Sequence, residues 1–366
     1  MIPWIKGQVS RQAHVDLPPN TFEEEYARSG FSGKYAHLYR SAPPVGWTHI
    51  EGDLKPRAYD IKLRSIKSQH LLEGRMPLLG NQDVVVSIQP LDKPMSYFFR
   101  NADSDELYFA HKGSGRLETD FGPLTYETGD YLYIPRGTVY RLDPKTASEF
   151  LLIESASEFQ FPDKGMLGQH ALFDPAVLEV PDPSLGVTTM TQASSYELKI
   201  QREGQITTVH YPFCPINTIG WKGTLSVWKL NVRDIRPISS DRYHLPPSAH
   251  TTLVAKNFVV CSFLPRPLEN GDPKAMKVPF YHSNIDYDEV LFYHAGDFFS
   301  RSGISHGMLT FHPQGIHHGP HPKAIARTNQ QQNTNEIAVM IDTRYPLKRL
   351  EQSNRIEIED YWKSWM

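Results

Sequence analysis

The sequence contains little cysteine and no long apolar run. Only Cys214 and Cys261 occur among 366 residues, so a disulfide framework is not expected and both are interpreted as small buried hydrophobes. Residues 1–16 lack an apolar signal core, and the longest apolar runs are far too short to span a bilayer. These absences exclude a disulfide-stapled domain and a helical membrane protein. We therefore expect a soluble, cytoplasmic protein without a membrane partner.

Charge of one sign is not concentrated anywhere in the chain. The formal net charge is −3, and the 38 basic residues are spread along the sequence. No basic run indicates a nucleic-acid partner, and no acidic tail indicates a solvating arm. A chain of 366 residues is long for one domain and comfortable for two. The composition thus predicts a two-domain globular protein that does not bind nucleic acid.

Aromatic and β-branched residues occur in short runs. Tyr and Phe number 18 each, and runs such as 84–88, 131–134 and 257–260 are separated by Gly, Pro, Asn or Asp every dozen residues or so. This spacing is typical of an all-β sandwich or barrel. Helical patterns are scarce. Thr21 to Ala27 begins with a capping box, and Ile356 to Trp365 predicts a short C-terminal helix.

Two distant segments share the same spacing of turn residues. In each, a Glu is followed by six residues and a Gly, in the pairs Glu106–Gly113 and Glu289–Gly296. A second motif repeats the order Gly, Pro, Gly and a ring-bearing residue at equal offsets, as Gly129, Pro135, Gly137 and Tyr140 and as Gly307, Pro313, Gly315 and His318. Such punctuation suits strand–turn–strand units. The repeat resembles the two motifs of the cupin superfamily, a double-sheet jelly roll, and favours a bicupin over two unrelated hairpins.

The two copies differ where metal chemistry would occur. The first copy has Tyr140 at the position of His318 and no histidine at the position of His282, so we predict that it is metal-free and structural. The predicted organisation is an N-terminal arm (1–60), an N-terminal cupin-like domain without metal (61–165), a C-terminal cupin domain with the metal site (166–350) and a C-terminal helix (351–366).

His282, Glu289 and His318 form a candidate metal-ligand set in the second copy. Three ligands from three strands can occupy one face of an octahedron and leave the other positions open, as in mononuclear non-haem Fe(II) oxygenases. Zinc in a hydrolytic site has a similar donor set. Asn284 stands where many cupins supply a further histidine, which limits the site to three protein ligands.

Histidine is more frequent in this stretch than three ligands require. A cluster of this kind is also typical of a solvated metal-scavenging loop, and its members are His306, His312, His317, His318 and His321. The preceding Pro-x-Gly-x-x spacing favours His318, and period-two alternation puts His317 on the opposite face. His321 is a candidate for a supporting position or a substrate contact. Asp286 and Asp288 are weaker carboxylate candidates because they break the spacing of the repeat.

Beyond general cupin character, the chain resembles the homogentisate 1,2-dioxygenase family over most of its length. The tract from Tyr281 to Asn284, followed by Glu289, is similar to that family's Tyr-His-Arg-Asn tract and iron-binding Glu. The tract His318-Gly-Pro is similar to its iron-binding His-Gly-Pro. Residues 101–142 are similar to its degenerate N-terminal cupin, and His244 lies in a segment that resembles its His-x-x-Pro-Ser stretch.

The resemblance implies a ring-cleaving dioxygenase that uses Fe(II) and O2 on a hydroquinone carrying an acetate side chain. His244 would be the acid/base, because the family's matching histidine is taken to have that role. Homogentisate would give maleylacetoacetate, a step of tyrosine and phenylalanine breakdown. The resemblance also implies a homo-oligomer, either a trimer or a pair of trimers.

Several positions depart from the family pattern around the expected substrate. Phe298 stands where the family has a Tyr near the substrate, and Arg301 occupies the place of a following basic residue, where it could grip a carboxylate. Tyr281 is a further candidate contact. These departures predict a divergent branch that acts on homogentisate or a related hydroquinone. The residues themselves also leave open a metal-dependent isomerase or hydrolase and a non-catalytic ligand-binding bicupin.

Overall fold

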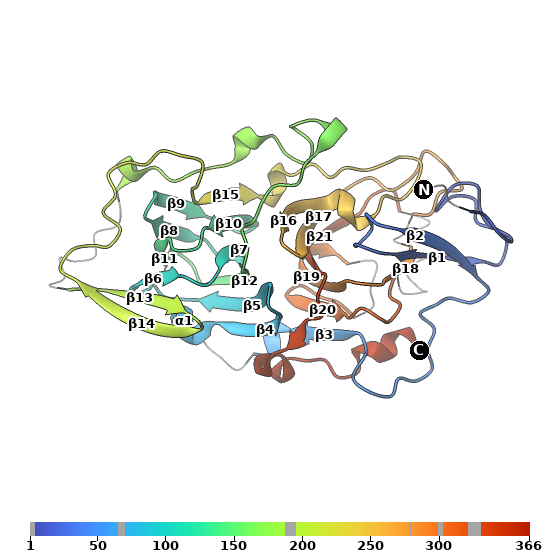
Figure 1. Ribbon diagram of the computed structural model, residues 1–366, viewed down its shortest axis with the longest axis horizontal. Coiled ribbons are helices and arrows are strands. Elements are labelled where there is room, and N and C mark those ends of the chain that lie inside the picture. The colour runs from blue at the N-terminus through green and yellow to red at the C-terminus, as the bar shows by residue number, and fades with distance from the viewer. Residues whose placement is uncertain (1–3, 65–69, 187–194, 278–279, 299–302, 321–330) are drawn as a thin grey trace. The chain divides into compact units, whose positions relative to one another are not determined.

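The computed structural model describes residues 4–64, 70–186, 195–277, 280–298, 303–320 and 331–366 and divides the chain into two compact units (Figure 1). Unit 1 comprises Met1–Lys62, Arg236–Leu347 and Ile356–Met366, and unit 2 comprises Leu63–Ile235 and Lys348–Arg355. This division differs from the predicted domain bounds. Strand pairing is the reason, because residues 22–60 supply strands to the sheets of unit 1 and residues 196–231 supply strands to those of unit 2.

Unit 2 consists of two packed sheets. Its seven-stranded sheet has the order β15 (Trp228–Asn231), β10 (Asp130–Ile134), β7 (Asp105–Lys112), β12 (Ser148–Ser155), β5 (Val84–Leu91), β4 (Met76–Gly80) and β22 (Lys348–Arg349). Its six-stranded sheet has the order β14 (Gln205–Tyr211), β13 (Tyr196–Arg202), β6 (Phe98–Asn101), β11 (Val139–Pro144), β8 (Gly115–Thr119) and β9 (Gly122–Tyr126). An aromatic core joins them, in which the ring centres of Tyr108 and Tyr140 lie 6.3 Å apart.

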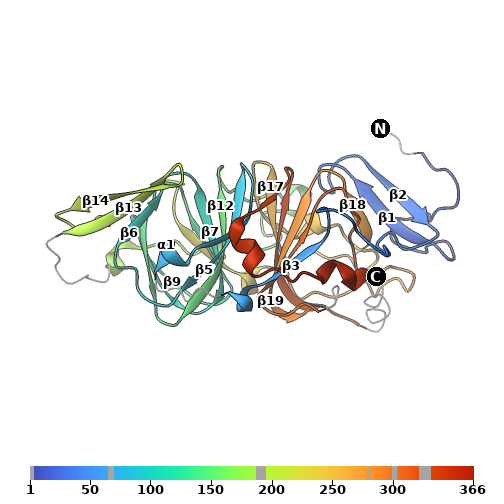
Figure 2. The same ribbon diagram turned by 90° about the horizontal axis from the view of Figure 1, so that it is seen from below.

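Unit 1 also contains two sheets. Its six-stranded sheet has the order β16 (Thr251–Ala255), β17 (Phe258–Phe263), β21 (Asn335–Thr343), β19 (Asp288–Asp297), β20 (Met308–His312) and β3 (Arg57–Asp60). A three-stranded sheet has the order β18 (Tyr281–Asn284), β1 (Phe22–Ala27) and β2 (Tyr35–Arg40), and Figure 2 shows β1 and β2 side by side in blue. Cys261 is buried in the core of this unit.

Helices are short in both units. The single described α-helix is α1 (Leu71–Gly74). The described 3-10 helices are η1 (Ile61–Leu63), η2 (Gly165–Leu167), η3 (Pro175–Val177), η4 (Pro183–Leu185), η5 (Val232–Asp234), η6 (Pro247–His250), η7 (Glu351–Arg355) and η8 (Tyr361–Trp365). They connect strands and leave the sheets as the framework, so the predicted all-β class is confirmed.

The central strands of the two large sheets correspond. In unit 2, β7 lies between β10 and β12, and Glu106 on β7 is opposite Glu154 on β12. In unit 1, β19 lies between β20 and β21, and Glu289 on β19 is opposite Asp342 on β21. The repeat in the sequence is therefore a repeat in the fold, and the chain is a bicupin.

Glycine is required at equivalent positions of the repeat. Gly113 and Gly296 have φ angles of +90° and +84°, which side chains other than glycine rarely adopt. A Cβ atom at Gly296 would also lie 1.6 Å from the carbonyl oxygen of Asn335, so no side chain can be placed there without moving β21. The equal spacing from Glu to Gly in the sequence therefore reflects the need for a positive φ angle at this glycine in both units.

Two sequence predictions of helix were wrong or too long. Thr21 to Ala27 carries a capping-box pattern, yet Phe22–Ala27 is strand β1, which pairs with β2 and, in parallel, with β18. Long-range pairing overrides the local helical signal here. The predicted C-terminal helix over 351–366 consists of two separate 3-10 helices, η7 and η8, with an isolated bridge at Glu357 between them.

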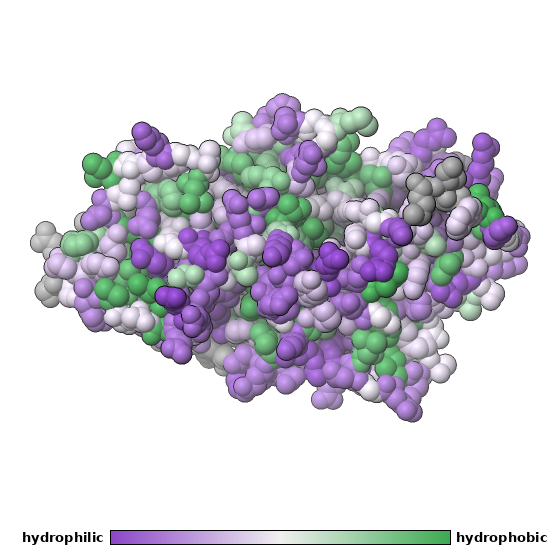
Figure 3. Space-filling model, viewed as in Figure 1, coloured by the Kyte–Doolittle hydropathy of each residue, from purple (hydrophilic) through white to green (hydrophobic). Residues whose placement is uncertain are grey.

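The surface carries no dominant apolar region on the side drawn in Figure 3, where hydrophobic residues form small patches among hydrophilic ones. Scattered exposure of this kind is ordinary for globular proteins. Among the described residues, none of the helices has the length and apolarity needed to cross a membrane.

Candidate metal centre

Three buried side chains of unit 1 converge from three different strand segments. His282 is on β18, Glu289 is on β19, and His318 follows the Pro-Gln-Gly turn after β20. The backbones of His282 and His318 form a two-way bridge, with N–H···O distances of 3.0 and 3.1 Å. Gly319 allows this close approach, since a Cβ atom there would lie 2.9 Å from the ring of Tyr281.

The ligand atoms of these three residues lie within 4.8 Å of one another. Glu289 Oε2 is 3.7 Å from His282 Nε2 and 3.5 Å from His318 Nε2. Both Nε2 atoms are shielded from water and make no hydrogen bond within the described part of the chain. Buried polar atoms without partners are costly, so this arrangement fits a metal ion held by two imidazoles and one carboxylate.

The protonation states also fit metal binding. Burial lowers the pKa of the His318 imidazole to about 3, so this ring is neutral near pH 7. Burial alone would raise the pKa of Glu289, but the neighbouring imidazoles, among them His312 at 2.7 Å, hold it well below its ordinary value. A neutral imidazole and an ionised carboxylate are the forms that coordinate metals.

Two of the three ligands, His282 and Glu289, are oriented by a partner behind them. His282 Nδ1 lies 3.0 Å from the carbonyl oxygen of Phe280, which leaves Nε2 facing the centre. His312 Nδ1 lies 2.7 Å from Glu289 Oε1, and His312 Nε2 lies 3.3 Å from the Tyr361 hydroxyl. Sequence reasoning placed His312 only in a histidine cluster. Its position opposite Glu289 in the β19–β20 register was the signal that would have identified it.

A cavity beside the ligand group is lined by two further histidines, His244 and His250. His282 and Glu289 line it, together with His244, Leu245, Pro247, His250, Phe263, Leu264, Arg266, Phe280, Leu291, Thr334, Glu336 and Met340. His244 Nδ1 lies 3.0 Å from Glu269 Oε1, and Arg266 Nη1 lies 3.3 Å from the same oxygen. Burial lowers the pKa of His244, although Glu269 acts in the opposite direction. The His244 ring is therefore neutral near pH 7, and it lies on the wall of the cavity.

The other predicted contacts are distributed differently. Tyr281 is buried beside the ligands, but its hydroxyl has no hydrogen-bond partner among the described residues. Phe298 packs against Tyr293 at a ring distance of 4.9 Å and lines a separate pocket with Lys62 and His306. Arg301 and His321 lie outside the described residues.

His317 is turned away from the ligand group. Its Nε2 atom lies 2.9 Å from Glu24 Oε1, whereas the neighbouring His318 faces Glu289. Alternation along an extended segment accounts for the opposite directions of these two adjacent side chains.

At the equivalent position of unit 2, the side chain of an arginine lies among the carboxylates, where unit 1 has its candidate metal ligands. The buried Arg75 guanidinium lies 3.1 Å from Glu106 Oε1, 3.0 Å from Glu154 Oε1 and 3.2 Å from the Tyr108 hydroxyl. Tyr108 in turn contacts the hydroxyl of Tyr140, at 2.8 Å. A fixed side-chain cation thus neutralises the carboxylates that the repeat places there.

Known proteins resemble this chain at several levels. Among solved structures, a Bacillus subtilis oxalate decarboxylase mutant is 12% identical with a TM-score of 0.37, covering 84% of this chain and 82% of its own. A cupin 2 conserved barrel protein from Leptotrichia buccalis is 11% identical with a TM-score of 0.36, covering 79% of this chain and 96% of its own.

Sequence comparison gives the nearer relationships. A family model described as the N-terminal part of homogentisate 1,2-dioxygenase matches residues 59–232. A Saccharolobus solfataricus protein named "Putative dioxygenase" is 33% identical, covering 94% of this chain and 92% of its own. The human homogentisate 1,2-dioxygenase is 23% identical, covering 81% of this chain and 76% of its own. The Rhodopseudomonas palustris enzyme is 25% identical over 73% of this chain, which spans 62% of that enzyme's length. The chain is a divergent member of the homogentisate 1,2-dioxygenase family.

Proposed function

We propose that the protein is an Fe(II)-dependent ring-cleaving dioxygenase that acts on homogentisate, giving maleylacetoacetate, or on a closely related hydroquinone acid. The observation that carries this proposal is the buried group of His282, Glu289 and His318 beside a cavity whose wall holds the neutral His244. The dioxygenase relatives support the reaction class.

His282, Glu289 and His318 would hold the iron. Two imidazoles and one carboxylate are the donor set of non-haem Fe(II) oxygenases, and the bound ion supplies open positions for activating a phenolic substrate and O2. His312 and the Phe280 carbonyl orient two of these ligands, Glu289 and His282. Such partners typically affect metal affinity or activity by roughly 10–100-fold.

His244 would act as the general base. Its Nδ1–H donates to Glu269, which leaves Nε2 as the proton acceptor for a phenolic hydroxyl in the cavity. After ring opening, the same nitrogen can return the proton. Phe280 and His250 pack around this region, and their burial keeps water away from the reacting ring.

Arg266 would recognise the acid group of the substrate. Among the described residues that line the cavity, it carries the only permanent positive charge. Its guanidinium has five N–H donors, of which one nitrogen contacts Glu269 and the carbonyl of Pro267. The remaining donors can bind a carboxylate in a forked arrangement.

The direct test is oxygen uptake by the purified chain. After anaerobic reconstitution with Fe(II), the protein is mixed with homogentisate, gentisate and other hydroquinone acids in an oxygen-electrode cell. We expect one of them to consume O2 in an iron-dependent reaction and to give a ring-opened product. Turnover without O2, or turnover that requires zinc instead of iron, would favour a cupin isomerase or hydrolase and contradict the proposal.

Glu269→Gln tests whether His244 is the base that controls the pH dependence of the reaction. Because Glu269 raises the pKa of His244, its removal should lower that pKa, so the acid limb of kcat/KM moves to lower pH. The limb of the unmodified enzyme should already lie below pH 6.5, since the neutral base persists until pH falls through a lowered pKa. The rate at neutral pH should fall by part of the roughly 10²–10⁴-fold that a general base contributes.

The measurement is a pH–rate profile of iron-saturated enzyme, with His244→Ala as the reference for complete loss of the base. An acid limb that stays in place in Glu269→Gln would show that His244 does not control it.

A further inference from the structure

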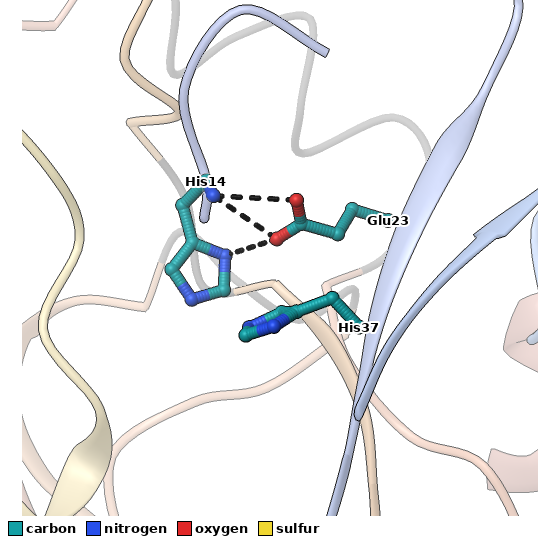
Figure 4. A group of neighbouring side chains, drawn as sticks. All are labelled: His14, Glu23 and His37. Atoms are coloured by element: carbon teal, nitrogen blue, oxygen red, sulfur yellow. Dashed lines mark hydrogen bonds and ion pairs between the residues drawn. The ribbon is translucent and has the colours of Figure 1, made fainter. Parts of the chain in front are cut away.

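A second group of buried imidazoles and carboxylates lies in unit 1, away from His282, Glu289 and His318. His14, Glu23 and His37 offer ligand atoms that all lie within 4.8 Å of one another. Figure 4 shows Glu23 and His37 reaching toward the His14 ring from the neighbouring strands. Glu23 is on β1 and His37 is on β2, and strand alternation adds Glu25 to the same face, since Glu25 is paired with His37. The sequence prediction treated this region as an arm and did not single out any of the four.

The imidazole nitrogens of this cluster lie close to carboxylate oxygens, and the two contacts of Glu25 have the length expected between ligand atoms of one metal ion. Glu25 Oε2 lies 3.5 Å from His14 Nε2 and 3.5 Å from His37 Nε2. Bonds of about 2.0–2.1 Å in a tetrahedral zinc site place neighbouring ligand atoms roughly 3.3 Å apart. His14 Nδ1 lies 2.6 Å from Glu23 Oε1, so the two nitrogens of this ring face different carboxylates, and a single ion can bind only one of the nitrogens.

The imidazole nitrogens are not satisfied by ordinary hydrogen bonds. His14 Nδ1 and His37 Nε2 are shielded from water, and neither makes a hydrogen bond of acceptable geometry with any described residue. The short contact from His14 to Glu23 is therefore not aligned as an N–H···O bond. In a network that merely shares protons, these nitrogens would point their hydrogens at the carboxylates. Atoms that converge without such alignment are typical of a ligand set.

Two buried carboxylates also require a compensating cation. Glu23 is 0% exposed and Glu25 is 8% exposed. Buried negative charges are stable only when paired or bound to metal.

We propose that His14, Glu23 and His37 bind a second divalent metal ion of the zinc class. Imidazole and carboxylate are donors that zinc takes in proteins, and Glu25 lies beside this group. The site ties the segment before β1 to the β1–β2 hairpin. The His14 ring stacks on Phe280 at 4.2 Å and 10°, and the Phe280 carbonyl is the partner of His282. The second ion therefore stabilises one wall of the candidate catalytic cavity without touching substrate.

Metal content of the full-length protein tests this site independently of catalysis. The unmodified chain and His318→Ala are stripped with a chelator, incubated with excess Zn²⁺, desalted and analysed for zinc per chain. We expect two equivalents in the unmodified chain and one in His318→Ala. Adding His37→Ala to His318→Ala should remove the remaining equivalent. The exposed His49, which lies 3.9 Å from Glu51, gives the matched control, and His49→Ala should keep both equivalents.

A second measurement covers the case in which His37→Ala fails to fold. Co²⁺ added to His318→Ala, which leaves the cluster intact, should give visible absorption bands of a four-coordinate site. The proposal is overturned if His318→Ala retains no zinc and shows no such bands, or if a folded His318→Ala/His37→Ala chain holds as much zinc as His318→Ala. Loss of oxygen uptake alone does not bear on this result, because the zinc count needs no substrate.

Discussion

Replacing His318 by alanine should abolish iron-dependent oxygen uptake. The change removes one of the two imidazoles and leaves Glu289 Oε2 without its neighbour at 3.5 Å. Loss of an outer partner of a metal ligand typically costs roughly 10–100-fold, so loss of the ligand itself should exceed about 100-fold. Iron content after anaerobic reconstitution and desalting, together with the initial rate of O2 consumption, measures the effect.

The matched control is the adjacent residue. His317→Gln keeps a donor for Glu24 and does not alter the ligand group, since the His317 side chain faces Glu24. We expect it to retain iron and most of the turnover. If His318→Ala still turned over substrate while His317→Gln did not, the assignment of the ligand would be reversed.

Arg75→Met should destabilise the protein by about 3–5 kcal/mol, the usual cost of removing one partner from a buried charge group. Methionine fills much of the same volume but leaves Glu106 and Glu154 without their shared cation. Burial and the charge of Glu154 already raise the pKa of Glu106 to about 7, even though Arg75 lowers it. Without Arg75 that pKa rises further.

Because the pKa of Glu106 is raised, the loss of stability in Arg75→Met should grow as the pH rises. A carboxyl whose folded-state pKa is raised contributes stability below its unfolded pKa and loses it as pH rises through the folded value. Arg75→Met should therefore be closest to the unmodified chain near pH 5 and furthest from it near pH 8. Urea denaturation followed by tryptophan fluorescence at both pH values measures the free energy of unfolding.

Two further variants make the result specific. Arg202 is exposed beside Glu203, and Arg202→Met should change stability by no more than about 0.5 kcal/mol. Adding Glu106→Gln to Arg75→Met removes one uncompensated charge and should recover part of the loss. An Arg75→Met protein as stable as the unmodified chain at both pH values would contradict the assigned role of the guanidinium.

The parts of the fold that could be predicted from the sequence are those set by nearby residues whose spacing repeats along the chain. Gly113 and Gly296 need a left-handed backbone, and that need is visible as spacing between Glu and Gly. The same spacing led to Glu289 and to His318 rather than His317. Alternation along a strand is a local property, so it could be applied without knowing which strands pair.

The features that sequence did not indicate depend on distant partners. Glu23 and Glu25 look like the first turn of a helix, yet each faces a histidine across or beyond the β1–β2 pair. Arg75 lies 31 residues before Glu106 and has no spacing that marks it as a cation substitute. His312 becomes informative only when the β19–β20 register is known. Pairing between segments far apart in sequence cannot be inferred from one chain by periodicity.

The parallel pairing of β1 with β18 has a consequence for protein synthesis. Glu24 on β1 is in register with Tyr281, and 281 − 24 gives a separation of 257 residues. At about 5–20 residues per second, the ribosome needs roughly 13–50 s to supply the partner strand. During that interval residues 63–235, which form most of unit 2, are already complete. The edge of β1 that does not pair with β2 must wait for its partner. Its three consecutive glutamates, Glu23 to Glu25, are the kind of charge that discourages a free strand edge from joining another chain.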